Sequence, residues 1–84
     1  MVPILVPELG LASTSPLVVS CWLVDVGGAV IEGDRIVELQ SNEITIDVAS
    51  PASGRLSKIE MGRSKKVRAG DTLGWIEADG DDGE

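Results

Sequence analysis

Two pairs of carboxylates recur at positions that could support acid–base chemistry, Asp34 with Glu38 and Asp71 with Glu77. Acid–base catalysis needs a proton donor or acceptor that is positioned against a reacting group. Asp34 and Asp71, however, each follow a glycine in equivalent Gly-Asp turns, where an aspartate side chain commonly caps its own turn. Two such symmetric turns make a poor active site, so we expect no catalytic residue in this chain.

The other residue types indicate neither a nucleophile nor a metal site. The chain has one cysteine, Cys21, and no histidine, so no imidazole is present to activate the thiol. Cys21 lies between Ser20 and Trp22 in an apolar run, which is typical of a buried, small hydrophobic residue. No set of metal ligands is spaced along the chain, and the acids near the C-terminus are suited at most to weak, unspecific calcium binding.

Acidic residues are concentrated at the C-terminal end. Five of the fourteen acids lie in the last eight positions, and residues 1–76 carry a net charge of only −2. We therefore expect one domain over residues 1–78 and an acidic tail or the start of a linker over residues 79–84. The chain lacks the basic stripe that binds nucleic acid, and no apolar run is long enough to cross a membrane. Without a signal-peptide pattern, a cytoplasmic protein is the default expectation.

The apolar residues predict an all-β domain. Valine, isoleucine and leucine dominate, ten glycines interrupt them, and no long window keeps a helical period free of Gly or Pro. An 84-residue chain is enough for one domain. The expected strands are 1–6, 17–26, the two arms of a hairpin over 36–48, 55–61, 67–69 and 73–77, with a short apolar link at 29–32.

The clearest hairpin spans residues 36–48, and its tip is the two-residue loop Asn42-Glu43. In this register Ser41 faces Ile44, and the pairs that follow place all apolar residues on one face. A slip of one residue would set apolar positions opposite polar ones, so the alternation fixes the register. Asn42 suits the backbone of a tight hairpin turn, whereas Glu43 is less suitable than glycine, which leaves the turn type open.

An internal repeat relates the two halves of the chain. Segment 30–36 recurs as 67–73 at an offset of 37 residues, each with an initial valine, a central Gly-Asp and a final aliphatic residue. Upstream, a match at an offset of 35 predicts two extra residues near 63–66. Neither half is long enough to enclose a core, so we expect a flattened β-barrel or sandwich of two pseudo-twofold-related, four-stranded halves. The same symmetry places the hairpin tip at one end of the domain and both termini at the other.

The order and spacing of these features resemble the lipoyl domains of 2-oxoacid dehydrogenase acyltransferase (E2) subunits, within the biotinyl/lipoyl carrier fold. The matching elements extend over nearly the whole chain: Val6-Pro7-Glu8-Leu9-Gly10, Trp22 before Gly27, Gly33-Asp34, Glu38-Leu39, Ser50-Pro51 with Gly54, and Val67-x-x-Gly70-Asp71-x-Leu73. In that family the hairpin tip reads Asp-Lys. The resemblance implies that lipoate is joined to this lysine by an amide and carries acyl groups between active sites.

The tip departs from the family pattern at the attachment residue. The resemblance aligns Glu43 with the family lysine and Asn42 with the aspartate, and a carboxylate cannot accept lipoate through an amide. Lys58, Lys65 and Lys66 lie in the second half of the chain, and none of them maps onto the tip. We expect no bound cofactor, and we interpret the chain as an unmodified interaction or assembly module. The resemblance implies protein partners, namely other subunits of a 2-oxoacid dehydrogenase complex.

Other interpretations of Glu43 stay open. The lysine could have been replaced by design to obtain an unmodifiable carrier, although the changes at residues 40–42 argue against a single engineered substitution. The domain could also be a lipoyl-like hairpin of a non-carrier protein such as a membrane-fusion adaptor.

The loop before residue 17 is a candidate recognition surface. In lipoyl domains the loop beside the tip helps partner enzymes recognise the domain. The alternative is that this loop is a plain solvated connector. The corresponding residues here are Leu11, Ala12, Ser13, Thr14 and Ser15.

Overall fold

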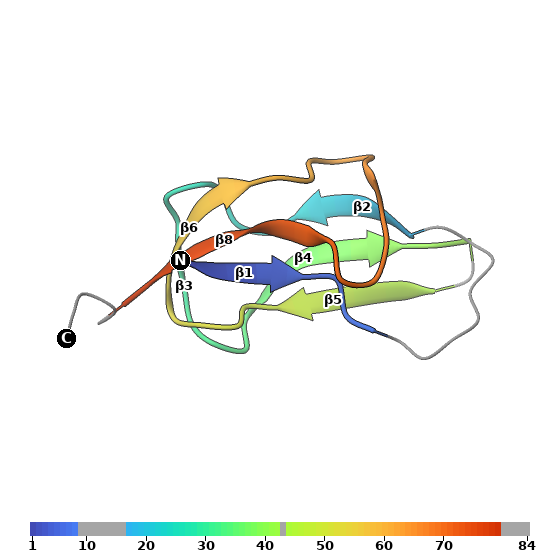
Figure 1. The fold of residues 1–84 in the computed structure, drawn as a ribbon. Coiled ribbons are helices and arrows are strands. Elements are labelled where there is room, and N and C mark those ends of the chain that lie inside the picture. Colours follow the sequence, from blue (N-terminus) through green and yellow to red (C-terminus); the bar gives the residue numbers. More distant parts are fainter. Residues whose placement is uncertain (9–16, 43, 80–84) are drawn as a thin grey trace.

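The computed structural model describes residues 1–8, 17–42 and 44–79, which form two four-stranded antiparallel sheets (Figure 1). One sheet has the strand order β1-β8-β6-β3 and the other β5-β4-β2-β7. The two sheets pack face to face as a flattened sandwich, which confirms the expected all-β fold. The strands are β1 (Val2–Leu5), β2 (Leu17–Trp22), β3 (Ala29–Val30), β4 (Arg35–Gln40), β5 (Thr45–Ala49), β6 (Gly54–Ile59), β7 (Lys66–Val67) and β8 (Thr72–Ala78).

The strand after residue 17 is shorter than the sequence indicates. A strand over 17–26 was expected, but β2 ends at Trp22, because a tight turn closes at residues 25–28. In this turn the Gly28 backbone N–H donates to the Asp25 carbonyl at 2.8 Å. The apolar link expected at 29–32 begins with the two-residue strand β3.

The two halves of the chain are intertwined, because each sheet takes two strands from each half. Strands β2, β3 and β4 recur as β6, β7 and β8 with a single offset of 37 residues between matching positions. The expectation of two extra residues near 63–66 is therefore wrong, since β2–β3 and β6–β7 are joined by connections of equal length. The halves differ in length elsewhere: the chain between β1 and β2 is seven residues longer than the chain between β5 and β6.

Irregularities of the backbone repeat with the same period. The register shift between Val19 and Cys21 in β2 has its counterpart between Leu56 and Lys58 in β6, 37 residues later. Such bulges bend the strand and increase its twist. Because both sheets carry the same bulge at the same place, they curve alike and can cover each other's inner faces.

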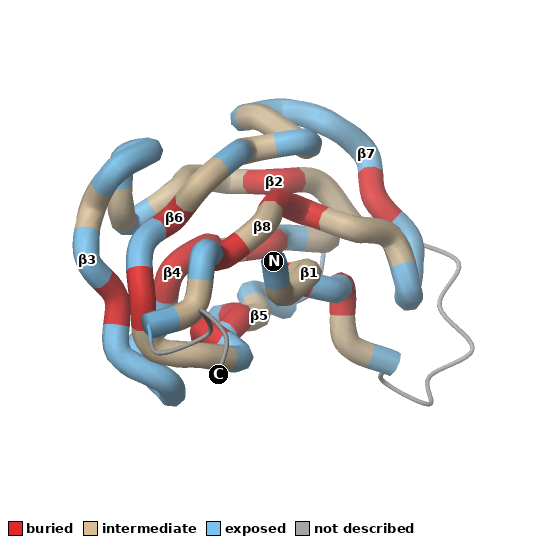
Figure 2. The backbone as a smooth tube through the Cα atoms, turned by 60° about the vertical axis from the view of Figure 1, so that its left-hand side comes forward, coloured by how far each residue is buried: buried red, intermediate tan, exposed pale blue. Residues whose placement is uncertain are grey.

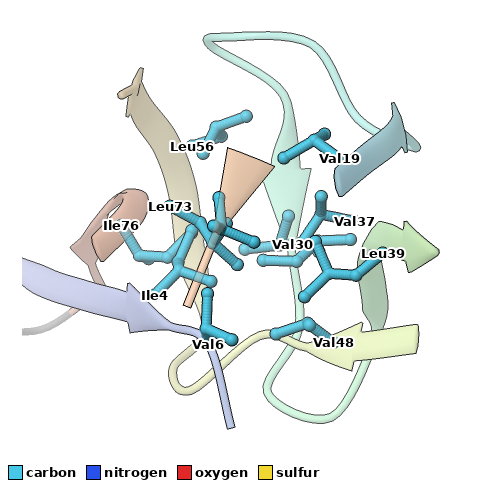
Figure 3. Packing of buried hydrophobic residues seen from close by; sticks show 12 residues of the cluster. Ile4, Val6, Val19, Val30, Val37, Leu39, Val48, Leu56, Leu73 and Ile76 are labelled. Carbon is cyan, nitrogen blue, oxygen red and sulfur yellow. The ribbon is translucent and has the colours of Figure 1, made fainter. Parts of the chain in front are cut away.

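The core lies between the two sheets and is built largely from repeat-related residues. Figure 3 shows Ile4, Leu73 and Ile76 of one sheet pointing toward side chains of the other. All twelve core residues are at most 7% exposed. Those that repeat at the offset of 37 are Val19 with Leu56, Val30 with Val67, Ile36 with Leu73, and Leu39 with Ile76. The halves therefore contribute matched sets of side chains to one shared core.

One buried position of β8 has no room for a side chain. Gly74 lies in β8 beside β6, where a Cβ atom would be 2.5 Å from the Lys58 carbonyl oxygen and 3.0 Å from the Trp22 ring. The indole N–H of Trp22 donates to the Met61 carbonyl at 2.9 Å, which holds the ring over this site. The missing side chain of Gly74 thus makes room for the half-buried Trp22.

Substituting Gly74→Ala should lower the free energy of unfolding by about 2 kcal/mol, because the added methyl group meets backbone and must displace the β6–β8 pairing. Urea denaturation followed by tryptophan fluorescence measures the loss as a lower midpoint at unchanged slope. Gly62→Ala is the matched control, since a Cβ there has no neighbour within 4 Å. Equal losses in both variants would contradict the packing role of Gly74.

The turn before β7 contains a strained residue. In the turn Gly62–Lys65 the Lys65 N–H donates to the Gly62 carbonyl at 3.1 Å, and Ser64 has a φ of 75°. The repeat-related turn has Gly27 at this position with a φ of 92°. Positive φ is a left-handed backbone conformation that costs a residue with a Cβ about 1–2 kcal/mol. The second half therefore stores strain at Ser64 that the first half avoids.

Ser64→Gly should raise the free energy of unfolding by roughly 0.5–1 kcal/mol, because relief of the strain exceeds the extra freedom that glycine gives the unfolded chain. The reciprocal variant, Gly27→Ser, should lower it by about 1 kcal/mol, since a Cβ there meets no neighbour and only the backbone strain changes. Thermal unfolding by circular dichroism measures both. A destabilised Ser64→Gly variant would show that the serine is not strained.

A candidate functional site at the hairpin tip

The β4–β5 hairpin has the register that the sequence indicates. The observed partners are Val37 with Val48, Glu38 with Asp47, Leu39 with Ile46, and Gln40 with Thr45. Val37, Leu39 and Val48 are buried on the inner face, whereas Gln40, Thr45 and Asp47 are exposed. The predicted alternation is confirmed, and the core thereby fixes which residues reach the tip.

The residues that flank the tip are held by hydrogen bonds. The Ser41 backbone N–H donates to the Ile44 carbonyl at 2.9 Å, and the Ile44 N–H donates to the Ser41 side-chain oxygen at 3.1 Å. This confirms that Ser41 faces Ile44 across positions 42 and 43. Asn42 is exposed. Glu43 lies outside the described residues.

The tip flanks lie at the end of the domain opposite the start of the chain. In Figure 1 the N-terminus and the end of β8 are at the left, whereas the end of β4 and the start of β5 are at the right. Ile44 is 41% exposed. This arrangement agrees with the symmetry argument, and it leaves the hairpin end accessible to a large partner.

Lys66 is nearer to the tip than the sequence interpretation indicates. It pairs with Val18 in β2, and Val18 pairs with Gln40, the last residue of β4. Two strand spacings separate the backbones of Lys66 and Gln40, about 10 Å. Lys58, by contrast, lies in the other sheet and forms an ion pair with Glu60 at 3.4 Å. The sequence signal for this position is the 37-residue repeat. If the repeat is taken without interruption, it makes β7 the counterpart of β3 and so places Lys66 in a strand beside β2.

The candidate acid–base residues have structural roles. Asp34 accepts the Ile31 N–H at 3.0 Å, and Asp71 accepts the Arg68 N–H at 2.8 Å. Each carboxylate caps its own turn, as the sequence indicates.

The structure also describes the surroundings of Cys21 and the positions of potential metal ligands. Cys21 is half-buried opposite Glu38, rather than buried as expected, because it lies on the outer face of its sheet. The recognition-loop candidates, residues 11–15, lie outside the described residues. In the part of the chain that the structure describes, no three potential metal ligands come together. None of the described segments forms an apolar helix of the length that a bilayer crossing requires.

Comparison with known proteins identifies the chain's relatives. A family model described as "Biotin-requiring enzyme" matches residues 2–76. The succinyltransferase component of the 2-oxoglutarate dehydrogenase complex of Bartonella vinsonii is 35% identical over 73 residues, which are 87% of this chain and 18% of that protein. The acetyltransferase component of the acetoin cleaving system of Bacillus subtilis is 31% identical over 75 residues, 89% of this chain and 19% of that protein. The chain thus spans about a fifth of these relatives.

A solved structure supports the fold. The lipoyl domain of the 2-oxoglutarate dehydrogenase complex from Azotobacter vinelandii superposes with a TM-score of 0.69 at 22% sequence identity. The match covers 90% of this chain and 95% of the solved chain. At this identity the likeness concerns the arrangement of strands, and it supports the intertwined two-sheet sandwich described above.

Proposed function

The chain belongs to the biotin/lipoyl attachment family, as a homologue of the lipoyl domains of 2-oxoacid dehydrogenase E2 components, and from this premise we propose that its hairpin tip carries no lipoate. The observation that supports the proposal is Glu43 in the sequence, between an Asn42 and an Ile44 whose neighbours keep the hairpin register. In this proposal the domain works as an unmodified interaction or assembly module.

The chemistry of attachment is the main argument. Lipoate is joined through its carboxyl group, and an amide forms only where the protein supplies an amine. Glu43 offers a second carboxylate instead, so the residue at this position does not fit the cofactor. The only lysines of the chain are Lys58, Lys65 and Lys66. None of them occupies a hairpin tip: Lys58 lies within β6, Lys65 ends the turn before β7, and Lys66 is the first residue of β7.

The rest of the domain is suited to presenting a surface. The described residues that flank position 43 are not members of the twelve-residue core, so in this proposal the scaffold does not depend on the residue at the attachment position. Proteins that are components of 2-oxoacid dehydrogenase complexes are among the relatives, and subunits of such a complex are the partners that we propose. The compact unit in this proposal is residues 1–78, with residues 79–84 as an acidic tail or linker start.

Incubation of the chain with a lipoate–protein ligase, ATP and lipoate should leave its intact mass unchanged, because no amine is displayed at the hairpin tip. Intact-mass spectrometry after exhaustive reaction measures this, with a lipoyl domain that has the tip lysine as the positive control. A gain of one lipoyl group, at Lys66 or at any other residue, would overturn the proposal.

The double variant Glu43→Lys with Asn42→Asp should become lipoylated, because the hairpin register that positions the family lysine is already present. The expected result is a mass gain of one lipoyl group, mapped to position 43 by peptide analysis. Glu43→Gln with Asn42→Asp is the matched control. It changes the same two positions, but the glutamine side chain ends in an amide and supplies no amine for the lipoyl group. An unmodified double variant would mean that the surface recognised by the ligase has changed as well.

A further inference from the structure

The basic residues of this chain are clustered, although its net charge is −7. Four of the seven bases, Arg63, Lys65, Lys66 and Arg68, lie within six consecutive positions. All four are exposed, and Figure 2 shows exposed chain on both sides of the buried residue in β7. We call these four side chains and the turn that holds them the basic turn.

The basic turn differs from the other bases in having no internal partner in the part of the chain that the structure describes. Arg35 forms an ion pair with Asp47 at 3.2 Å, and Lys58 forms one with Glu60. Arg55 donates to the Gly27 carbonyl at 3.0 Å. No such contact involves the side chains of the basic turn within the described ranges. Their charges are therefore available to an external carboxylate.

The backbone of the basic turn is held firmly on the sheet. The Ser64 N–H donates to the Val19 carbonyl at 2.8 Å, and the Val19 N–H donates to the Lys65 carbonyl at 2.9 Å. Val67 is 3% exposed and anchors the following strand in the core. The strained φ of Ser64 fixes the conformation between two basic residues. Backbone strain of this kind persists only where the surroundings impose it, and it is frequent at binding sites.

We propose that the basic turn is a docking surface for the acidic C-terminal segment, residues 77–84, of a second copy of this chain. That segment contains five acids and no base, so it complements the four positive charges of the turn. This inference rests on the proposed function, an interaction module, and it names the surface and the partner.

The geometry favours contact between copies over contact within one chain. Ala78, the end of β8, pairs with Gly54 at the start of β6, whereas the basic turn follows the far end of β6. In Figure 1 the N-terminus and the end of β8 lie at one end of the domain, away from the start of β5. The basic turn and the end of β8, from which the segment continues, thus lie at opposite ends of the domain, so the proposed contact joins one end of one copy to the other end of the next.

A protein segment fits the basic turn better than nucleic acid does. Bases of single strands stack on aromatic side chains, but the indole groups of Trp22 and Trp75 donate to Met61 and Glu60. A net charge of −7 also repels a long polyanion. A short segment with spaced carboxylates meets the local positive charge and avoids most of this repulsion.

Titration of the ¹⁵N-labelled full chain with a peptide of residues 77–84, acetylated and amidated, tests the proposal. Chemical shifts should change at the amides of Val19, Ser64 and Lys65, with a dissociation constant on the order of 1 mM in low salt, as expected for a few exposed ion pairs. Raising NaCl from about 20 to about 300 mM should weaken binding about tenfold, because salt screens exposed charges.

Matched charge variants make the outcome decisive. Lys65→Gln with Lys66→Gln should weaken peptide binding about fivefold, whereas Arg55→Gln with Lys58→Gln, which removes the same charge from β6, should change it less than about twofold. Sedimentation of the full chain should show an average mass that rises with concentration. Neutralising the segment by Asp79→Asn, Asp81→Asn and Asp82→Asn should abolish this rise while peptide binding persists.

Several results would overturn the docking proposal. The first is that chemical shifts at the basic turn do not change on titration. The second is that the Lys65→Gln/Lys66→Gln and Arg55→Gln/Lys58→Gln variants lose peptide affinity equally. The third is that an eight-nucleotide oligothymidylate binds more tightly than the peptide, which would assign the turn to nucleic acid. A failed titration leaves the mass assay for lipoylation unaffected, so this proposal and the proposed function can fail separately.

Discussion

The structure depends on one constraint, which is that neither half of this chain can bury its own apolar residues. Each sheet therefore takes two strands from each half, and residues such as Leu39 and Ile76 meet in a common core. A domain of this size buries only about 60% of the surface that its unfolded chain exposes. The margin left for imperfect packing is small. Matched side chains and matched bulges in the two sheets are the way in which this chain fills the space between them.

The same constraint determines which positions are free to change. Register in the β4–β5 hairpin is set by Val37, Leu39 and Val48, because a slip of one residue would turn all three toward water. The described residues beyond them, Ser41, Asn42 and Ile44, are not part of the core cluster. The packing of the core therefore does not depend on which residues stand at these three positions. Fold and attachment chemistry are separable in this domain for a physical reason.

Sequence patterns predicted the fold because they reflect this shared core. Alternation located the hairpin and its register, and the repeated Gly-Asp turns of residues 33–34 and 70–71 located the symmetry. Prediction failed where backbone geometry decides without a sequence pattern. Residues 23–26 are as apolar as a strand, but the turn at 25–28 interrupts them. The match at an offset of 35 relied on Gly62, whereas Ser64 is the residue in the conformation of Gly27. Serine gives no signal for positive φ, so the true correspondence was hidden.

Function is best sought where the two halves differ, because symmetry accounts for the positions at which they agree. Three differences separate them. The first half has a second arm, β5, after its hairpin tip, whereas β8 is the last strand of the described chain. The connection between β1 and β2 is seven residues longer than its counterpart, and the turn before β7 is basic and strained where its counterpart has two glycines. The described residues that flank these features lie at one end of the domain. The tip follows Gln40, the long connection leads into Leu17, and β7 pairs with Leu17 and Val18 beside it. The other end, which carries the N-terminus and the end of β8, keeps the shorter and simpler version of each feature. The strained backbone of Ser64 lowers the free energy of unfolding, and it lies at the end of the domain that holds the tip. At the other end Gly27 adopts the same conformation without this cost. The end of the domain that holds the hairpin tip therefore keeps features that the shared core does not require.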